Sequence, residues 1–216
     1  MSEPRRLPRW LWPVGLAGVL GGGALLATGL LADTGPSYRN FVIPSESMEP
    51  TLRTREQFLA RTSDFLPIER GAVYLVRKRG VVFAYRVIGL PGDTVAMASS
   101  KVVVNNQSAT YSRDAITGTA GSCMSGERPQ VRREQLPGGA SHEIQLCEVS
   151  HGQDMDAMKI PVGHYFLLGD NRGNAADSRY SGPHWGLGLV PESDFVGKAE
   201  RILVSRDSAR IGKEID

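Results

Sequence analysis

Two serines separated by one residue are the feature of this chain that points most directly to chemistry. Ser45 and Ser47 follow an apolar run and precede Met48 and Pro50. On an extended backbone, residues two positions apart face the same side, so one hydroxyl could attack a carbonyl carbon while the other donated to its oxygen. The spacing suggests a serine nucleophile. The alternative, which composition alone favours, is a solvated turn at Pro44–Ser47.

A long uncharged stretch precedes the serines. Residues Trp10–Leu31 carry no charged side chain, and a helix of that length rises far enough to cross a bilayer core of about 30 Å. Three arginines precede the stretch and Asp33 follows it, which predicts a cytoplasmic N-terminus and an exported remainder. A cleaved signal peptide is the alternative, but the run exceeds the usual apolar core of about 7–15 residues. We therefore expect cytoplasmic residues 1–9 and a single membrane anchor over 10–31.

The charge balance of the exported part is flat. Of 25 basic and 23 acidic residues in the chain, three arginines and Glu3 precede the anchor, which leaves 22 of each. A nucleic-acid-binding protein needs a basic face. The composition therefore indicates no nucleic-acid partner.

The two cysteines, Cys123 and Cys147, lie on the side of the membrane where disulfides form. A bridge between them would close a loop of about 25 residues and contribute on the order of 3 kcal/mol through the unfolded state. Two buried thiols are the alternative. The spacing gives no support for a zinc site, and we expect neither metal nor cofactor.

Strand signals dominate the exported part. Alternating or continuous apolar runs separated by glycine-, proline- and asparagine-rich turns predict three hairpins. A further short strand runs into Gly169, and no long amphipathic helical pattern occurs after the anchor. The fold is therefore predicted to be mainly β. The hairpin strands are expected at 72–76 and 81–88 across Arg77–Gly80, at 101–104 before Asn105 and Asn106, and at 131–136 and 142–146 across 137–139.

Three separated blocks resemble type I signal peptidases in order and spacing. They are Pro44–Leu52, Arg86–Asp93 and Gly169–Tyr180, and the likeness extends to Leu189–Glu192 and Val196–Ala199. The resemblance implies a signal-peptidase-like β fold after one transmembrane helix. Residues 98–160 lie outside these blocks and are more polar and richer in turns than their flanks. This predicts an inserted polar β lobe between the segments 32–97 and 161–216 of a catalytic-type β domain.

The same resemblance implies a membrane-bound serine endopeptidase that cleaves signal peptides from exported proteins after Ala-X-Ala-type sites, with a Ser-Lys dyad. Its partners would be preproteins and the lipid bilayer. Ser47 would be the nucleophile, and its main-chain N–H would form an oxyanion hole with the Ser45 hydroxyl. Met48 would lie at the membrane edge. Asp170, Asp177 and Arg179 would support the site. Asp177 and Arg179 could equally form an ion pair that only stabilises the fold.

The sequence departs from the family at the proton acceptor. The family's general-base lysine precedes the arginine of the second block, and this chain has Tyr85 there. A buried lysine loses its proton readily, whereas burial disfavours the tyrosine phenolate and leaves a donor. Many members carry a serine that holds the lysine amine, and this chain has Ala175 at that position. Both groups that serve one proton transfer are therefore replaced.

A substitute base is conceivable among the remaining side chains. His184, in the segment after the third block, could reach Ser47 from a loop. We interpret the other candidates as ordinary surface side chains, namely His142, His151, His164 and Lys78.

Three hypotheses stay open. The chain is an active signal peptidase or a specialised relative with a weakened or substituted base, a silent homologue that binds exported peptides without cutting them, or a structural membrane-anchored β protein.

Overall fold

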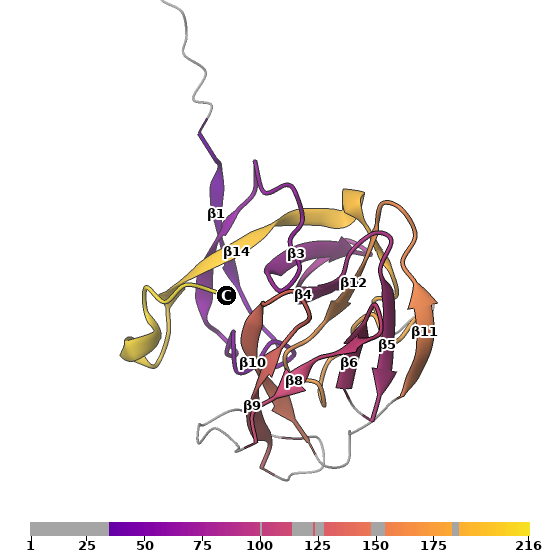
Figure 1. Cartoon of the computed structure of the whole chain (residues 1–216). Coiled ribbons are helices and arrows are strands. Elements are labelled where there is room, and N and C mark those ends of the chain that lie inside the picture. Colours follow the sequence, from indigo (N-terminus) through magenta and orange to yellow (C-terminus); the bar gives the residue numbers. More distant parts are fainter. Residues whose placement is uncertain (1–34, 100, 114–122, 124–127, 148–153, 183–185) are drawn as a thin grey trace, which may run out of the picture. The chain divides into compact units, whose positions relative to one another are not determined.

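The computed structural model describes residues 35–99, 101–113, 123, 128–147, 154–182 and 186–216, and these form a mainly β structure (Figure 1). The predicted fold class is confirmed for this part. The predicted cytoplasmic segment and anchor lie outside the described residues. Within the described ranges, no helix has the length and apolar character needed to cross a bilayer.

The main sheet has seven antiparallel strands. Their spatial order is β1 (Tyr38–Val42), β2 (Gln57–Arg61), β14 (Phe195–Val204), β3 (Val73–Lys78), β4 (Val81–Gly89), β12 (His164–Leu168) and β13 (Val190–Pro191). Strands between residues 38 and 89 thus pair in one sheet with strands between residues 164 and 204. As a result β12, which leads into Gly169, lies beside β4, which carries Tyr85.

Two smaller sheets complete the structure. One has the order β10 (Ser141–Leu146), β9 (Gln130–Gln135) and β8 (Thr110–Tyr111), and the other β11 (Met155–Lys159), β5 (Thr94–Ala98), β6 (Lys101–Val104) and β7 (Gln107–Ser108). The helices among the described residues are two short 3₁₀ turns, η2 (Glu192–Asp194) and η3 (Ser208–Arg210). The absence of a long helix after the anchor is therefore confirmed for the described residues.

All three predicted hairpins are present, and one turn is shorter than expected. Lys78 pairs with Val81, so only Arg79 and Gly80 form the turn, both at positive φ, 51° and 79°. Such a two-residue turn matches the twist of its strands. The prediction that the turn begins at Arg77 was wrong, because the basic run continues the strand. The other two hairpins join β6 to β7 and β9 to β10.

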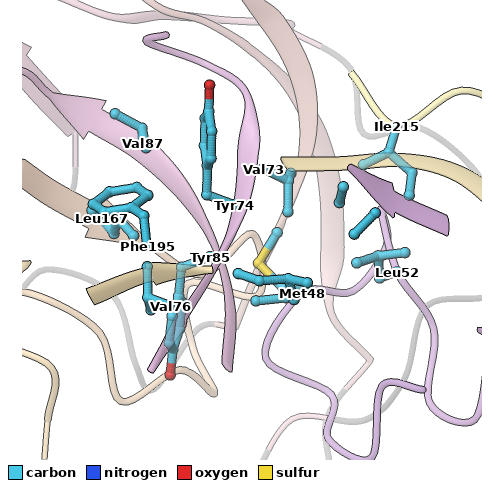
Figure 2. Packing of buried hydrophobic residues seen from close by; sticks show 14 of the residues in the cluster. Met48, Leu52, Val73, Tyr74, Val76, Tyr85, Val87, Leu167, Phe195 and Ile215 are labelled. Atoms are coloured by element: carbon cyan, nitrogen blue, oxygen red, sulfur yellow. The ribbon is translucent and has the colours of Figure 1, made fainter. Parts of the chain in front are cut away.

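The core follows from the apolar runs of the central strands. Residues 73–76 of β3 and 84–89 of β4 are buried at every position, as expected for strands covered on both faces. One cluster of buried side chains includes Met48, Leu52 and Tyr85 (Figure 2). The segment that carries the serines is thereby anchored in the same core as β3 and β4.

The predicted disulfide between Cys123 and Cys147 is present, with the Cα atoms 5.7 Å apart. Cys147 directly follows β10, so the bridge ties the end of that strand to Cys123. The division into a catalytic-type domain and an inserted lobe over 98–160 stays a prediction.

Candidate active site

The serine segment, residues 43–56, connects β1 to β2, and backbone hydrogen bonds hold it on both sides of the serines. Ile43 N donates to Glu56 O at 3.1 Å, and Leu52 N donates to Met48 O at 2.9 Å. Met48 and Leu52 are fully buried. The resemblance implied a place for Met48 at the membrane edge, whereas its side chain packs in the core. These anchors fix the backbone on either side of the serines.

The two serine hydroxyls lie together at the surface. Ser45 Oγ is 3.1 Å from Ser47 Oγ, Ser45 is exposed, and Ser47 is half-buried. The prediction of an extended backbone was wrong, because both residues lie in a bend and turn. A bend nevertheless brings the hydroxyls to hydrogen-bond distance, so an attacking group and a donor sit side by side and open to solvent.

The loop after β12 packs directly on the serine backbone. Asn171 N donates to Ser47 O at 3.0 Å, and Asn171 Nδ2 donates to Glu46 O at 3.2 Å. A Cβ atom at Gly169 would lie 2.6 Å from Ser47 O and 2.3 Å from Ala175 Cβ. Only glycine permits this approach. The loop therefore holds the Ser47 peptide by backbone contact.

One end of this loop carries a buried ion pair. Arg86 Nε and Nη2 donate to the two oxygens of Asp170 at 2.8 and 2.6 Å, and both side chains are fully buried. Thr51 Oγ1, from the serine segment, also donates to this carboxylate at 2.5 Å. Burial acts to raise the pKa of Asp170, but the charge and hydrogen bonds of Arg86 outweigh it and hold the pKa below its ordinary value. Asp170 is thus a fixed carboxylate.

Asp177 and Arg179 hold the other end of the loop together. Arg179 donates from Nε and Nη2 to the two Asp177 oxygens, each at 2.8 Å. Asp177 Oδ2 accepts from Gly169 N at 3.0 Å, and Arg179 Nη2 also donates to Arg172 O at 2.9 Å. The pair therefore contacts the loop backbone at Gly169 and at Arg172.

Tyr85 lies where the resemblance places a lysine. Its side chain is buried, and its hydroxyl donates to Ala176 O at 3.1 Å. Burial and the negative charge of Asp177 raise the pKa of the Tyr85 phenol above its ordinary value. The positive charge of Arg179 acts in the opposite direction, but its effect is smaller. The neighbouring Ala175 presents a methyl group. At these two positions the structure has a methyl group and a neutral phenol whose proton is already donated to a carbonyl.

The other candidate bases lie in different places. His184 and His151 are outside the described residues. His164 is half-buried at the start of β12, as expected, with Nδ1 3.1 Å from Val162 O. Lys78 is a strand residue rather than a solvated turn residue, and its amine donates to Leu187 O at 2.8 Å. It lines a pocket of about 230 Å³ together with Tyr85.

His142 contradicts the surface interpretation. It is buried in β10, with Nε2 2.9 Å from Glu134 Oε2 and 3.9 Å from Asp170 Oδ1. Burial and the nearby charge of Arg86 lower the pKa of His142, although both carboxylates act in the opposite direction. The sequence placed this histidine in a polar segment and gave no sign that its neighbours were buried charges.

Residues between 98 and 160 reach the loop, which the sequence did not predict. Gln145 N donates to Asp170 O at 2.8 Å, and Arg172 N donates to Gln145 O at 2.9 Å. Arg172 also forms a bidentate pair with Glu134 at 2.8 and 2.5 Å. The one sequence signal for a role of Glu134 was its position as a charged residue within a predicted strand.

The arrangement can present a hydroxyl to a carbonyl carbon and a second hydroxyl to its oxygen. Within the described ranges, no group of three or more histidine, cysteine or carboxylate side chains is placed to hold a metal ion. The Ser47 backbone and the Tyr85 phenol both contact the loop 169–177, and the phenol acts there as a donor rather than an acceptor.

Comparison with known proteins identifies the family. Two relatives are the signal peptidases I of Pseudomonas fluorescens, 36% identical over 190 residues, and of Pseudomonas aeruginosa, 33% identical over 189; each alignment covers 76% of this chain and 64% of the relative. Signal peptidase I S of Bacillus subtilis is 26% identical over 205 residues, covering 94% of this chain and 92% of the relative.

A solved signal peptidase I from Enterococcus faecalis is 21% identical and covers 62% of this chain and 98% of its own, with a TM-score of 0.38, too low to support an argument. The chain spans 64% of the length of the two Pseudomonas relatives. The family model described as "Signal peptidase, peptidase S26" matches residues 24–204. The chain therefore belongs to the signal peptidase family, peptidase S26.

Proposed function

We propose that this protein is a membrane-anchored serine endopeptidase that removes signal peptides from exported preproteins after Ala-X-Ala-type sites. Residues 10–31 form the anchor in the inner (plasma) membrane, the N-terminus is cytoplasmic, and the β structure is periplasmic or extracellular. Segments 32–97 and 161–216 form the catalytic-type domain, and 98–160 form an inserted lobe.

The observation that carries the proposal is the pair of accessible hydroxyls. Ser47 Oγ is the attacking atom, and the Ser45 hydroxyl, 3.1 Å away, donates with the Ser47 N–H to the developing oxyanion. Asn171 and Gly169 fix the peptide that carries both groups. Met48 anchors the turn in the core, and Asp170, Asp177 and Arg179 position the loop rather than touch the substrate.

The proton of Ser47 has no strong acceptor among the residues described around it. Loss of a general base typically costs about 10²–10⁴-fold in rate and leaves oxyanion stabilisation in place. We therefore propose slow cleavage by the natural chain, with His184 as the candidate substitute base.

One observation favours a second function, namely peptide binding without cleavage. The Tyr85 hydroxyl is already hydrogen-bonded to Ala176 O, and the preceding residue, Ala175, carries only a methyl group. A site that keeps its shape but lacks an acceptor can bind exported peptides without cutting them. This silent homologue would still seat a peptide carbonyl between the two serines.

Cleavage assays separate the two functions. The full chain in detergent is incubated with a preprotein, alongside Ser47→Ala, His184→Ala and the double variant Tyr85→Lys with Ala175→Ser. Cleavage by the natural chain that disappears in Ser47→Ala supports the peptidase. Cleavage by the double variant alone supports the silent homologue.

Two further results locate the base. Loss of natural cleavage in His184→Ala, with an unchanged unfolding curve, identifies His184. No cleavage by any variant, including the double variant, contradicts the peptidase proposal.

A further inference from the structure

The outer face of β4 carries a row of side chains that leads away from Tyr85. Val81, Phe83 and Tyr85 share one face because residues two apart in a strand point the same way. Val81 is 54% exposed and Phe83 is 38% exposed, whereas Tyr85 is 4% exposed. The rings of Phe83 and Tyr85 stack with centroids 6.2 Å apart. These three residues and Leu187 form the apolar wall of the pocket of about 230 Å³.

The same pocket is basic at the end away from Tyr85. Lys78 and Arg79 line it. Lys78 Nζ donates to Leu187 O at 2.8 Å, and Arg79 Nη2 donates to Gly182 O at 3.3 Å. In the described part of the chain, no carboxylate lies within ion-pair distance of either cation. Ammonium and guanidinium groups carry three and five donors, so both keep donors for an anionic group.

The spacing along β4 between Tyr85 and these cations corresponds to a short length of peptide. Lys78 pairs with Val81, and Tyr85 lies four positions further along β4, or about 13 Å at 3.3 Å per residue. Ser47 and Tyr85 both contact the loop 169–177. An extended peptide whose reacting carbonyl lies at Ser47 would bring a residue about four positions away to Lys78 and Arg79.

We propose that this pocket is a peptide subsite that selects an acidic side chain about four residues from the bond held at Ser47. The carboxylate binds Lys78 and Arg79, while an adjacent apolar side chain packs on Val81 and Phe83. A peptide suits the pocket better than a lipid because the wall is continuous with the candidate active site through Tyr85. The inference rests on the proposed function for the position of the bond but not for the binding itself.

Binding can be measured without cleavage. The full chain with Ser47→Ala in detergent is titrated with fluorescent peptides that span a preprotein junction. A single Asp is moved through the positions on both sides of the junction, and each peptide has an Asn counterpart. One or two adjacent positions about four residues from the junction should bind about fivefold tighter with Asp, the upper range for an exposed ion pair. The preference should shrink at high salt.

Variants of the cations provide the control. Lys78→Gln with Arg79→Gln should abolish the Asp preference, and Lys78→Glu with Arg79→Glu should reverse it in favour of a Lys peptide. Lys159→Gln, an exposed lysine of β11, should leave it unchanged. Unfolding curves confirm that each variant is folded.

The proposal is wrong if no peptide position shows a preference for Asp over Asn, or if the preference survives in the Gln variants. It is also wrong if the only property that the Gln variants lose is a higher affinity for nanodiscs of anionic lipid than for nanodiscs of neutral lipid. The last result would assign the cations to a membrane contact. Failure of the natural chain to cleave a preprotein would instead contradict the peptidase proposal and leave the binding preference measurable.

Discussion

The two ends of the loop 169–177 are built from opposite chemistry. At one end, Asp170 forms a fully buried ion pair with Arg86 and accepts a hydrogen bond from the half-buried Thr51 hydroxyl. At the other, Tyr85 offers a neutral phenol to a backbone carbonyl beside the methyl group of Ala175. The first end fixes the position of Ser47, and the second is where its proton would leave. The shape of the site is therefore maintained independently of the group that activates it.

The largest expected effect comes from breaking the charged end. Arg86→Met leaves Asp170 ionised and unpaired inside the protein, which should lower the free energy of unfolding by about 3–5 kcal/mol. The double variant with Asp170→Leu should recover part of this loss. Arg133→Gln removes an exposed ion pair with Glu143 and should cost at most about 1 kcal/mol. Urea unfolding measures all three. Equal effects of Arg86→Met and Arg133→Gln would contradict a structural role for the buried pair.

The serine pair tests whether the intact shape serves catalysis. Ser45→Ala should lower kcat by about 10²–10³-fold because one oxyanion donor is lost, with little change in stability since Ser45 is exposed. The assay uses the natural chain, or the variant Tyr85→Lys with Ala175→Ser if the natural chain is silent. Ser208→Ala, another exposed serine, is the control. An unchanged kcat would remove Ser45 from the oxyanion hole.

Acidification should weaken the charged end first. Burial and the charge of Arg86 lower the pKa of His142 in the folded protein. Near and below about pH 6.5 the unfolded chain therefore binds more protons than the folded protein, and the free energy of unfolding decreases as the pH is lowered. The slope from one group is at most about 1.4 kcal/mol per pH unit. The carboxylates that face His142, Glu134 and Asp170, also have lowered pKa values and add to the loss at more acidic pH.

Denaturant unfolding between pH 7.5 and 5 checks this expectation. His142→Gln should flatten the upper part of the curve. An identical slope in His142→Gln and the natural chain would show that His142 is not the group that titrates.

The smallest effect is expected at the phenol. Tyr85→Phe removes one hydrogen bond to Ala176 O and should cost about 0.5–1.5 kcal/mol in unfolding free energy. It should leave any cleavage rate unchanged, because a phenol with a raised pKa is not the proton acceptor. A fall in kcat at constant KM would make Tyr85 a participant and overturn the contrast between the two ends.

Local patterns in the sequence predicted the hairpins, because β-branched runs and turn residues act over a few positions. They also identified the serine pair and the replaced base, since family blocks align residue by residue. Lys78 was misplaced because a basic run reads as solvated, although a strand can carry it to its end. The bend at Ser45 and Ser47 follows from anchors at Ile43 and Leu52, which the spacing alone does not reveal.

Contacts between residues far apart in the chain could not be predicted from the sequence. The bidentate pair of Glu134 and Arg172 joins residues 38 positions apart, and neither local pattern indicates its partner. The burial of His142 depends on that pairing, so it was missed for the same reason. Polar composition suggested a peripheral lobe, whereas the backbone of Gln145 hydrogen-bonds on both sides of Asn171.

Gly169 has an evolutionary consequence. Its missing side chain lets the loop touch Ser47 O and Ala175 Cβ at once, so the shape of the site is encoded in a backbone contact, whereas its reactivity is encoded in side chains. A lineage can therefore exchange the residues at positions 85 and 175 without refolding the serine turn. On the proposed function, cutting and holding peptides would then be neighbouring states of one scaffold that differ at these two positions.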